Sequence, residues 1–112
     1  MTNSRRKGKE GELEWAKFLR SHGYDAHRGQ QYKGGGDSPD VTGLPGIHQE
    51  VKRVEKLNVH DAMDQSRRDA ADAEIPIVAH RRDRKSWLVT MDAEDFLNLY
   101  KRASDVAEDP ER

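Results

Sequence analysis

Two acidic residues and one lysine in this chain have the types and the spacing to act together in catalysis. Asp40 follows Pro39 at the end of a glycine-rich stretch, and Glu50-Val51-Lys52 begins ten residues later. Magnesium prefers oxygen ligands and commonly binds one or two carboxylates together with substrate phosphates and waters. Asp40 and Glu50 could supply two carboxylates from adjacent strands, and Val51 could supply a carbonyl oxygen between them. The pattern therefore predicts a site for a divalent cation.

Lys52 and a third acid, Glu12, extend this predicted site. A lysine beside a cation and a phosphate could orient a nucleophile and offset the negative charge that develops on the phosphate. Glu12 falls within the apolar stripe of the first predicted helix, and it could hold a second cation or its water shell. The glycines at 34–36 would let the backbone come close to a bulky polyanion. Each residue alone has an ordinary explanation, such as a turn or a solvated charge pair, but together they favour one site.

Hydrophobic periodicity and turn residues indicate the elements that hold these side chains. The predicted elements are a helix over 4–22 that ends at Gly23, a strand over 24–28, a glycine-rich loop over 29–46 with a brief apolar interruption at Val41, a strand over 47–54, a helix over 59–73, strands over 74–80 and 86–91, and a last helix capped by Asp92. Side chains alternate along a strand, so Glu50 and Lys52 should share one face. With the interruption at Val41 counted as a short strand, the order α-β-β-β-α-β-β-α predicts one α/β domain with a mixed central sheet flanked by helices.

Apolar residues are few for this length, but they are patterned. Of the 112 residues, 33% are hydrophobic and 37% are charged, against roughly 25% charged in typical globular proteins. Trp15 and Trp87 lie within apolar patterns and are predicted to belong to the core. The last helix has an apolar face, which consists of Phe96, Leu97, Leu99 and Tyr100. The length allows one domain, which we assign to residues 1–102, followed by a frayed acidic tail over residues 103–112.

The net charge of −1 conceals an uneven distribution. Residues 1–35 contain eight Lys and Arg against four acids, whereas residues 91–112 contain three against seven. A basic face suits a polyanion, although a solvated surface is the simpler explanation of the charge alone. No apolar run approaches the ~20 residues of a membrane span, and no apolar segment follows the basic N-terminus, so we expect a soluble intracellular protein. The absence of cysteine excludes disulfides and thiolate metal sites.

The ordered pair of Pro-Asp at positions 39–40 and Glu-Val-Lys at positions 50–52 resembles the signature of the PD-(D/E)XK nuclease superfamily. The opening residues 6–14 are similar to the first helix of archaeal-type Holliday junction resolvases, in which a Lys-Gly pair precedes a helix glutamate by four positions. Counting four positions from Gly8 leads to Glu12, which the helical stripe already singles out.

Residues 37–41 and 83–87 look most like small phage or prophage endonucleases of the resolvase type, and the resemblance covers about residues 6–100. It implies a restriction-endonuclease-like core that hydrolyses phosphodiester bonds of DNA to 5′-phosphate and 3′-hydroxyl ends. It also implies Mg²⁺ as the cofactor, with Mn²⁺ as a substitute. A homodimer that presents two sites to two strands of a four-way junction is expected, in the cytoplasm of a bacterial or phage-infected cell and away from membranes.

The resemblance also implies roles for individual residues. The implied active site comprises Glu12, Asp40, Glu50 and the Val51 carbonyl as metal ligands, Lys52 as the catalytic lysine, and Gln65 on the second helix. The implied DNA contacts are made by Lys7, Lys9, Arg28, Lys33, Ser38, Arg53 and Lys56.

Three functions remain open at this stage. The chain could be a magnesium-dependent endonuclease for branched DNA, a nicking or restriction-like nuclease for ordinary duplex, or a nucleic-acid-binding module without turnover. The near-neutral charge argues against tight non-specific DNA binding. A cluster of carboxylates is unfavourable without a cation, so we predict a nuclease. His48 should share a face with Glu50 and could approach the site, and the other four histidines lack zinc-ligand spacing; all five are predicted to be structural or surface residues.

Overall fold

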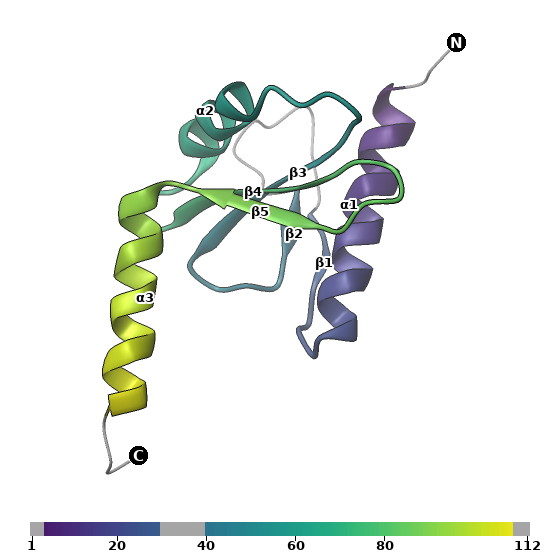
Figure 1. The fold of residues 1–112 in the computed structure, drawn as a ribbon. Coiled ribbons are helices and arrows are strands. Elements are labelled where there is room, and N and C mark those ends of the chain that lie inside the picture. The colour runs from purple at the N-terminus through teal and green to yellow at the C-terminus, as the bar shows by residue number, and fades with distance from the viewer. Residues whose placement is uncertain (1–3, 30–39, 109–112) are drawn as a thin grey trace.

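The computed structural model describes the backbone of residues 4–29 and 40–108 and the side chains of residues 8–29 and 40–106 (Figure 1). Its elements follow the predicted order. They are α1 (Ser4–Ser21), β1 (His27–Arg28), β2 (Val41–Thr42), β3 (Ile47–Arg53), α2 (Val59–Asp69), β4 (Ile75–Arg81), β5 (Leu88–Met91) and α3 (Ala93–Glu108). Helix α1 ends where predicted, because Gly23 adopts a φ of +94° and its N–H donates to the Arg20 carbonyl over 3.0 Å.

One five-stranded sheet forms the centre, with the strand order β1-β2-β3-β4-β5. Strands β3 and β4 are parallel and the other neighbouring pairs are antiparallel, so the sheet is mixed, as predicted. Trp15 of α1 donates to Gln49 of β3, whereas Gln65 of α2 accepts from Lys52 of β3. Gln49 and Lys52 are an odd number of residues apart and point to opposite faces. Helices α1 and α2 therefore cover opposite faces of β3.

Small apolar clusters fill the space between the helices and the sheet. Trp15 is the largest residue of the cluster beneath α1, and its ring lies 4.9 Å from that of Trp87, which packs at the cluster's edge. Beneath α2, Ala62 and Met63 pack against Val78. The buried polar and charged side chains are Glu12, His48, Gln49, Glu50 and Ser66. The interior thus includes a set of polar groups centred on β3.

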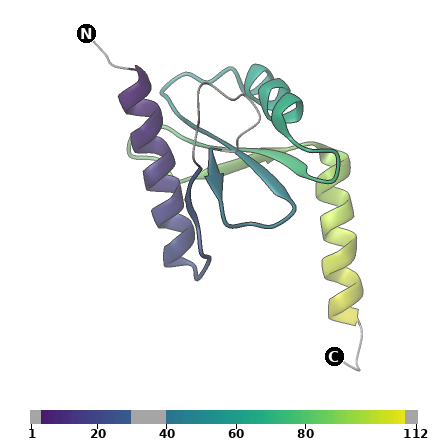
Figure 2. The ribbon, with the colours of Figure 1, turned by 180° about the vertical axis from the view of Figure 1, so that it is seen from behind.

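Helix α3 differs from the prediction in its length and its packing. It continues to Glu108, so residues 103–108 are helical rather than frayed, while residues 109–112 lie outside the described part of the chain. Phe96, Leu97 and Tyr100 of its predicted apolar face are 55%, 59% and 63% exposed. The helix follows the edge strand β5 and projects away from the sheet, as Figure 1 and Figure 2 both show. Among the described helices, none is long and apolar enough to cross a membrane.

Candidate active site

Strand β3 carries two of the predicted catalytic side chains toward α2. Glu50 and Lys52 share a face, as strand alternation predicted, and Glu50 is 1% exposed. Lys52 Nζ donates a hydrogen bond to Gln65 Oε1 over 3.1 Å. The structure therefore brings the predicted glutamine of α2 into contact with the predicted lysine. This contact fixes the ammonium group on the side of β3 where Glu50 lies.

Asp40 lies at the start of β2 and continues the ladder with β3. Its N–H donates to the Gln49 carbonyl over 3.1 Å, and its Oδ2 accepts from the Val51 N–H over 2.8 Å. The N–H and C=O of one strand residue point to the same side of the strand. The Val51 carbonyl therefore faces the edge of β3 that Asp40 occupies. The carboxylate and the carbonyl predicted to share a cation lie on one side of this strand.

Glu12 approaches the same region from α1. Its carboxylate is buried, and Oε1 accepts a hydrogen bond from Arg28 Nε over 2.6 Å. Burial raises the pKa of the Glu12 carboxyl, and the Arg28 guanidinium offsets part of this effect. The charges of Glu50 and Lys52 also act on Glu12. Arg28, which the resemblance assigns to DNA contact, is the ion-pair partner of this carboxylate.

Asp40 and Glu50 are electrostatically linked. Burial and then the negative charge of Glu50 raise the pKa of Asp40 from 3.8 to about 7. Burial acts against ionisation of Glu50 as well, but hydrogen bonds from His48 and Asp40 outweigh it and hold the pKa of Glu50 below its usual value. Asp40 is thus the carboxyl of this pair that retains a proton to neutral pH.

The donor set fits a hard divalent cation. Glu50 Oε2 is buried and has no hydrogen-bond partner among the residues that the structure describes. A buried carboxylate oxygen without a partner is unfavourable, and so is the approach of two carboxylates. A cation bound by Asp40 and Glu50 relieves both, and Mg²⁺ takes carboxylate and carbonyl oxygens. Asp40, Glu50 and the Val51 carbonyl therefore offer a suitable set of ligands.

Two residues that were not predicted for the site, His48 and Asp69, lie beside Glu50. His48 Nε2 is 3.0 Å from Glu50 Oε1. One ligand atom from each of His48, Glu50 and Asp69 lies within 4.8 Å of the other two. Strand alternation was the sequence signal for His48, because it placed this histidine on the Glu50 face. No local signal marks Asp69, since tertiary packing brings the end of α2 to β3.

The described basic residues that are assigned to DNA contact differ in their surroundings. Lys9 and Lys56 are exposed, whereas Arg53 forms ion pairs with Glu14 at 3.1 Å and Asp83 at 3.2 Å. Three predicted residues have side chains outside the described part of the chain, namely Lys7, Lys33 and Ser38. The predicted glycine run over 34–36 lies outside it as well.

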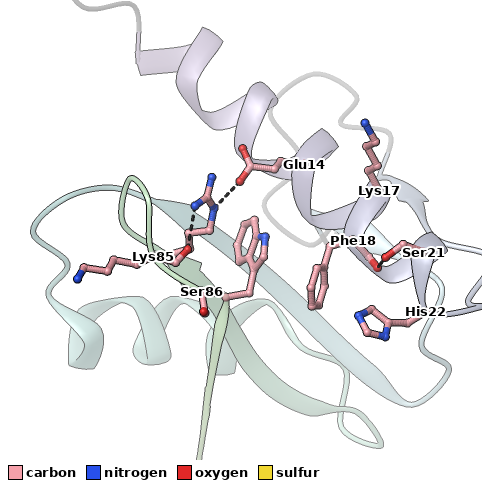
Figure 3. A pocket seen from close by; sticks show the side chains of 9 residues that line it. Glu14, Lys17, Phe18, Ser21, His22, Lys85 and Ser86 are labelled. Atoms are coloured by element: carbon pink, nitrogen blue, oxygen red, sulfur yellow. Dashed lines mark hydrogen bonds and ion pairs between the residues drawn. The ribbon is translucent and has the colours of Figure 1, made fainter.

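A separate groove gathers aromatic and basic side chains between α1 and the connection from β4 to β5 (Figure 3). Its volume is about 740 Å³, and its lining includes Lys17, Phe18, Lys85 and Trp87. None of the predicted active-site residues lines this groove. Residues 80–85 form a basic run, of which Arg81 and Lys85 line the groove.

No family model and no curated protein sequence matches the chain. Among solved structures, the chain is similar to Hjc, a Holliday junction resolvase from the archaeal hyperthermophile Archaeoglobus fulgidus. The TM-score is 0.57 and the sequence identity is 24%, over 76% of this chain and 72% of the resolvase chain. The chain therefore has the fold of this resolvase, and the predicted restriction-endonuclease-like architecture is confirmed.

Proposed function

We propose that this protein is a divalent-metal-dependent DNA endonuclease that cuts branched DNA such as a Holliday junction. The observation that carries the proposal is the meeting of Asp40, Glu50 and Lys52 at β3. The fold of a junction resolvase supports the same activity by a separate route. Asp40, Glu50 and Lys52 then form the PD-(D/E)XK signature of the chain.

The proposed catalytic roles follow from the contacts of each side chain. Asp40, Glu50 and the Val51 carbonyl would hold Mg²⁺, with Mn²⁺ as a substitute. When bound, the cation would neutralise charge on the phosphate and lower the pKa of the attacking water. Lys52, held in place by Gln65, would stabilise negative charge as it develops on the phosphate. Glu12 would complete the acidic site from α1.

DNA binding is proposed to use exposed basic side chains on both flanks of the site. Lys9 and Lys56 are exposed, and so is Lys85, which lines the groove that also contains Phe18 and Trp87. A base stacked on an aromatic ring and a phosphate near a lysine are the usual contacts with opened strands. The logarithm of the DNA-binding constant falls linearly with the logarithm of the salt concentration, and each phosphate contact that is removed lowers the magnitude of this slope by about 0.9. We therefore expect Lys85→Ala to flatten the slope by that amount, while Lys101→Ala on α3 leaves it unchanged.

A second copy of the chain is the proposed occupant of the apolar surface of β5 and α3. Phe96, Leu97 and Tyr100 of α3 are each more than half exposed, and so are Leu88 and Val89, which point to opposite faces of the edge strand β5. A four-way junction has two equivalent strands to cut, and a twofold dimer supplies two sites. Sedimentation equilibrium should show a dimer for the wild type and a monomer for Leu97→Glu. A monomeric wild-type protein would refute the proposed dimer.

The proposed activity is tested by cleavage of a four-way junction, a fork and a linear duplex of matched sequence in Mg²⁺. We expect the wild type to cut the junction fastest, and Asp40→Ala and Lys52→Ala to give no product above background. Asp72→Ala serves as the control, because Asp72 is an exposed acid in the connection from α2 to β4 and should keep the wild-type rate.

Each other outcome points to a different function. Equal cleavage of the linear duplex favours a nicking or restriction-like nuclease. DNA binding without products in any divalent metal favours a binding module. If the wild type and Asp40→Ala give the same rate, the proposed site is wrong.

A further inference from the structure

The α2 side of β3 carries a second group of potential ligands, of which the proposed function uses only Glu50. His48, Glu50 and Asp69 each place a ligand atom within 4.8 Å of the other two. His48 and Glu50 are each 1% exposed, and Asp69 is half-buried at the end of α2. The group is thus built from two neighbouring elements rather than from one exposed loop.

Two buried atoms of this group have no hydrogen-bond partner among the described residues. They are His48 Nδ1 and Glu50 Oε2. Buried polar atoms in proteins are nearly always paired, so both require an explanation. The Glu74 carboxylate is 4.0 Å from His48 Nδ1, which is beyond hydrogen-bond distance. A carboxylate shared by two cations offers one oxygen to each, so Glu50 Oε2 would bind the cation at Asp40, and Oε1, which lies 3.0 Å from His48 Nε2, would bind a cation on the α2 side.

Negative charge predominates around the histidine. The carboxylates of Glu50, Asp69 and Glu74 all lie close to it. Lys52 lies on the same face of β3 and donates to Gln65. The Asp69 and Glu50 carboxylates lie close to each other, and two like charges in proximity repel. A cation would offset this repulsion.

The distance between His48 and Glu50 also matches the spacing of two ligands on one metal ion. Their Nε2 and Oε1 atoms are 3.0 Å apart. Two metal–ligand bonds of about 2.1 Å at a right angle separate their ligand atoms by about 3 Å. The donor set contains an imidazole nitrogen, whereas the ligands proposed on the Asp40 side are all oxygens. Imidazole favours transition metals, and carboxylate accepts both transition metals and Mg²⁺.

We propose that His48, Glu50 and Asp69 form a second cation site, which takes a transition-metal ion of the Mn²⁺ or Zn²⁺ type. Glu50 is shared with the Mg²⁺ site proposed at Asp40, and the inference rests on the proposed function only in that respect. The two sites differ in their donors, with oxygen ligands at Asp40 and one nitrogen ligand at His48. The histidine that the sequence analysis predicted to be structural becomes a metal ligand.

The test is electron spin-echo spectroscopy of the full chain loaded with Mn²⁺, combined with calorimetric titration of Mn²⁺. A histidine ligand produces a modulation from the ¹⁴N nucleus, which oxygen ligands do not. We expect two Mn²⁺ per chain in the wild type and one in Asp40→Asn, with a ¹⁴N modulation in both. Asp69→Asn should raise the Kd of one site by at least about 10-fold, and His48→Gln should abolish the modulation.

Asp69→Asn and a control variant keep the outcome decisive. His48 is buried and its replacement could prevent folding, so Asp69→Asn, a conservative change at a half-buried position, carries the test by itself. Asp72→Asn is the matched control and should bind as the wild type does. The inference is overturned if the Mn²⁺-loaded wild type shows no ¹⁴N modulation. It is also overturned if Asp69→Asn binds Mn²⁺ with the same stoichiometry and Kd values as the wild type. Mg²⁺-dependent cleavage alongside either result leaves the proposed function intact and removes only the second site.

Discussion

The metal-free protein should become more stable when Asp40 is replaced by asparagine. Asp40 is partly buried beside Glu50, and its pKa of about 7 lies far above its ordinary value of 3.8. Above neutral pH the folded protein must therefore hold an ionised carboxylate where burial and Glu50 oppose the charge. Asparagine removes that charge and keeps an oxygen that can accept from the Val51 N–H. A residue proposed for catalysis is thus expected to reduce stability.

The sign and the size of the effect follow from proton linkage. Below pH 3.8 the carboxyl is protonated in both states and has no effect on the pH dependence. As the pH rises toward 7, the unfolded chain has lost its proton and the folded chain still holds it, so the free energy of unfolding falls. The full difference in pKa corresponds to roughly 4 kcal/mol above pH 7. Because side chains and water can relax around the charge, we expect Asp40→Asn to stabilise by about 1–3 kcal/mol.

Urea unfolding in EDTA, followed by circular dichroism at about pH 5 and about pH 8.5, measures this effect. The advantage of Asp40→Asn should be greater at the higher pH. Adding Mg²⁺ should stabilise the wild type and not the variant, because a ligand that binds the native state alone raises its stability. Asp72→Asn, at an exposed position, should leave the pH profile unchanged. A destabilised Asp40→Asn at the higher pH, or an advantage that does not grow with pH, refutes the reasoning.

Three other predictions concern Gly43, Gly46 and Gln65, the hydrogen-bond partner of Lys52. Gly43 has a φ of +121°, and a Cβ there would be 2.6 Å from Ala26 Cα, so Gly43→Ala should lower the free energy of unfolding by about 2–4 kcal/mol. Gly46 also has a positive φ, of 84°, but open space around it, so Gly46→Ala in the same urea titration should cost only about 1 kcal/mol. Gln65→Ala removes the acceptor of Lys52 and should slow single-turnover junction cleavage by about 10-fold or more, with DNA affinity unchanged.

Local patterns explain why most of the fold could be predicted. The apolar stripe of α1 reflects the face that the helix buries, and Gly23 marks a helix end that local conformation determines. Strand β3 is buried on both faces, but alternation still places Glu50 and Lys52 on the same one. Helix α2 ends at Asp69 although its apolar pattern continues to Ala73. Its last turn gives way to extended backbone at Ala70, so periodicity alone overestimated its length.

The exposed face of α3 shows the limit of such patterns. An apolar stripe predicts that a helix buries one face, but it does not say against what. Phe96 and Leu97 follow the expected spacing, yet they do not pack against the sheet. Only the direction in which the chain leaves β5 decides this, and that direction depends on tertiary structure.

In the candidate site, too, local patterns predict some residues, while other contacts depend on tertiary structure. Glu12 could be predicted because a carboxylate in an apolar helical stripe is unusual, and the structure buries it beside Arg28. The ion pair itself joins residues from α1 and β1, so no local spacing reveals it. Asp69 reaches Glu50 for the same reason, through the packing of α2 on β3.

The central claim is that Asp40, Glu50 and the Val51 carbonyl hold a divalent cation. Crystals grown with Mn²⁺ and measured at the manganese absorption edge test it most directly. The account predicts an anomalous peak bounded by these three groups, about 2.0–2.3 Å from each oxygen, and its loss in Asp40→Asn. Manganese found elsewhere on the chain, with no peak between Asp40 and Glu50, would contradict it.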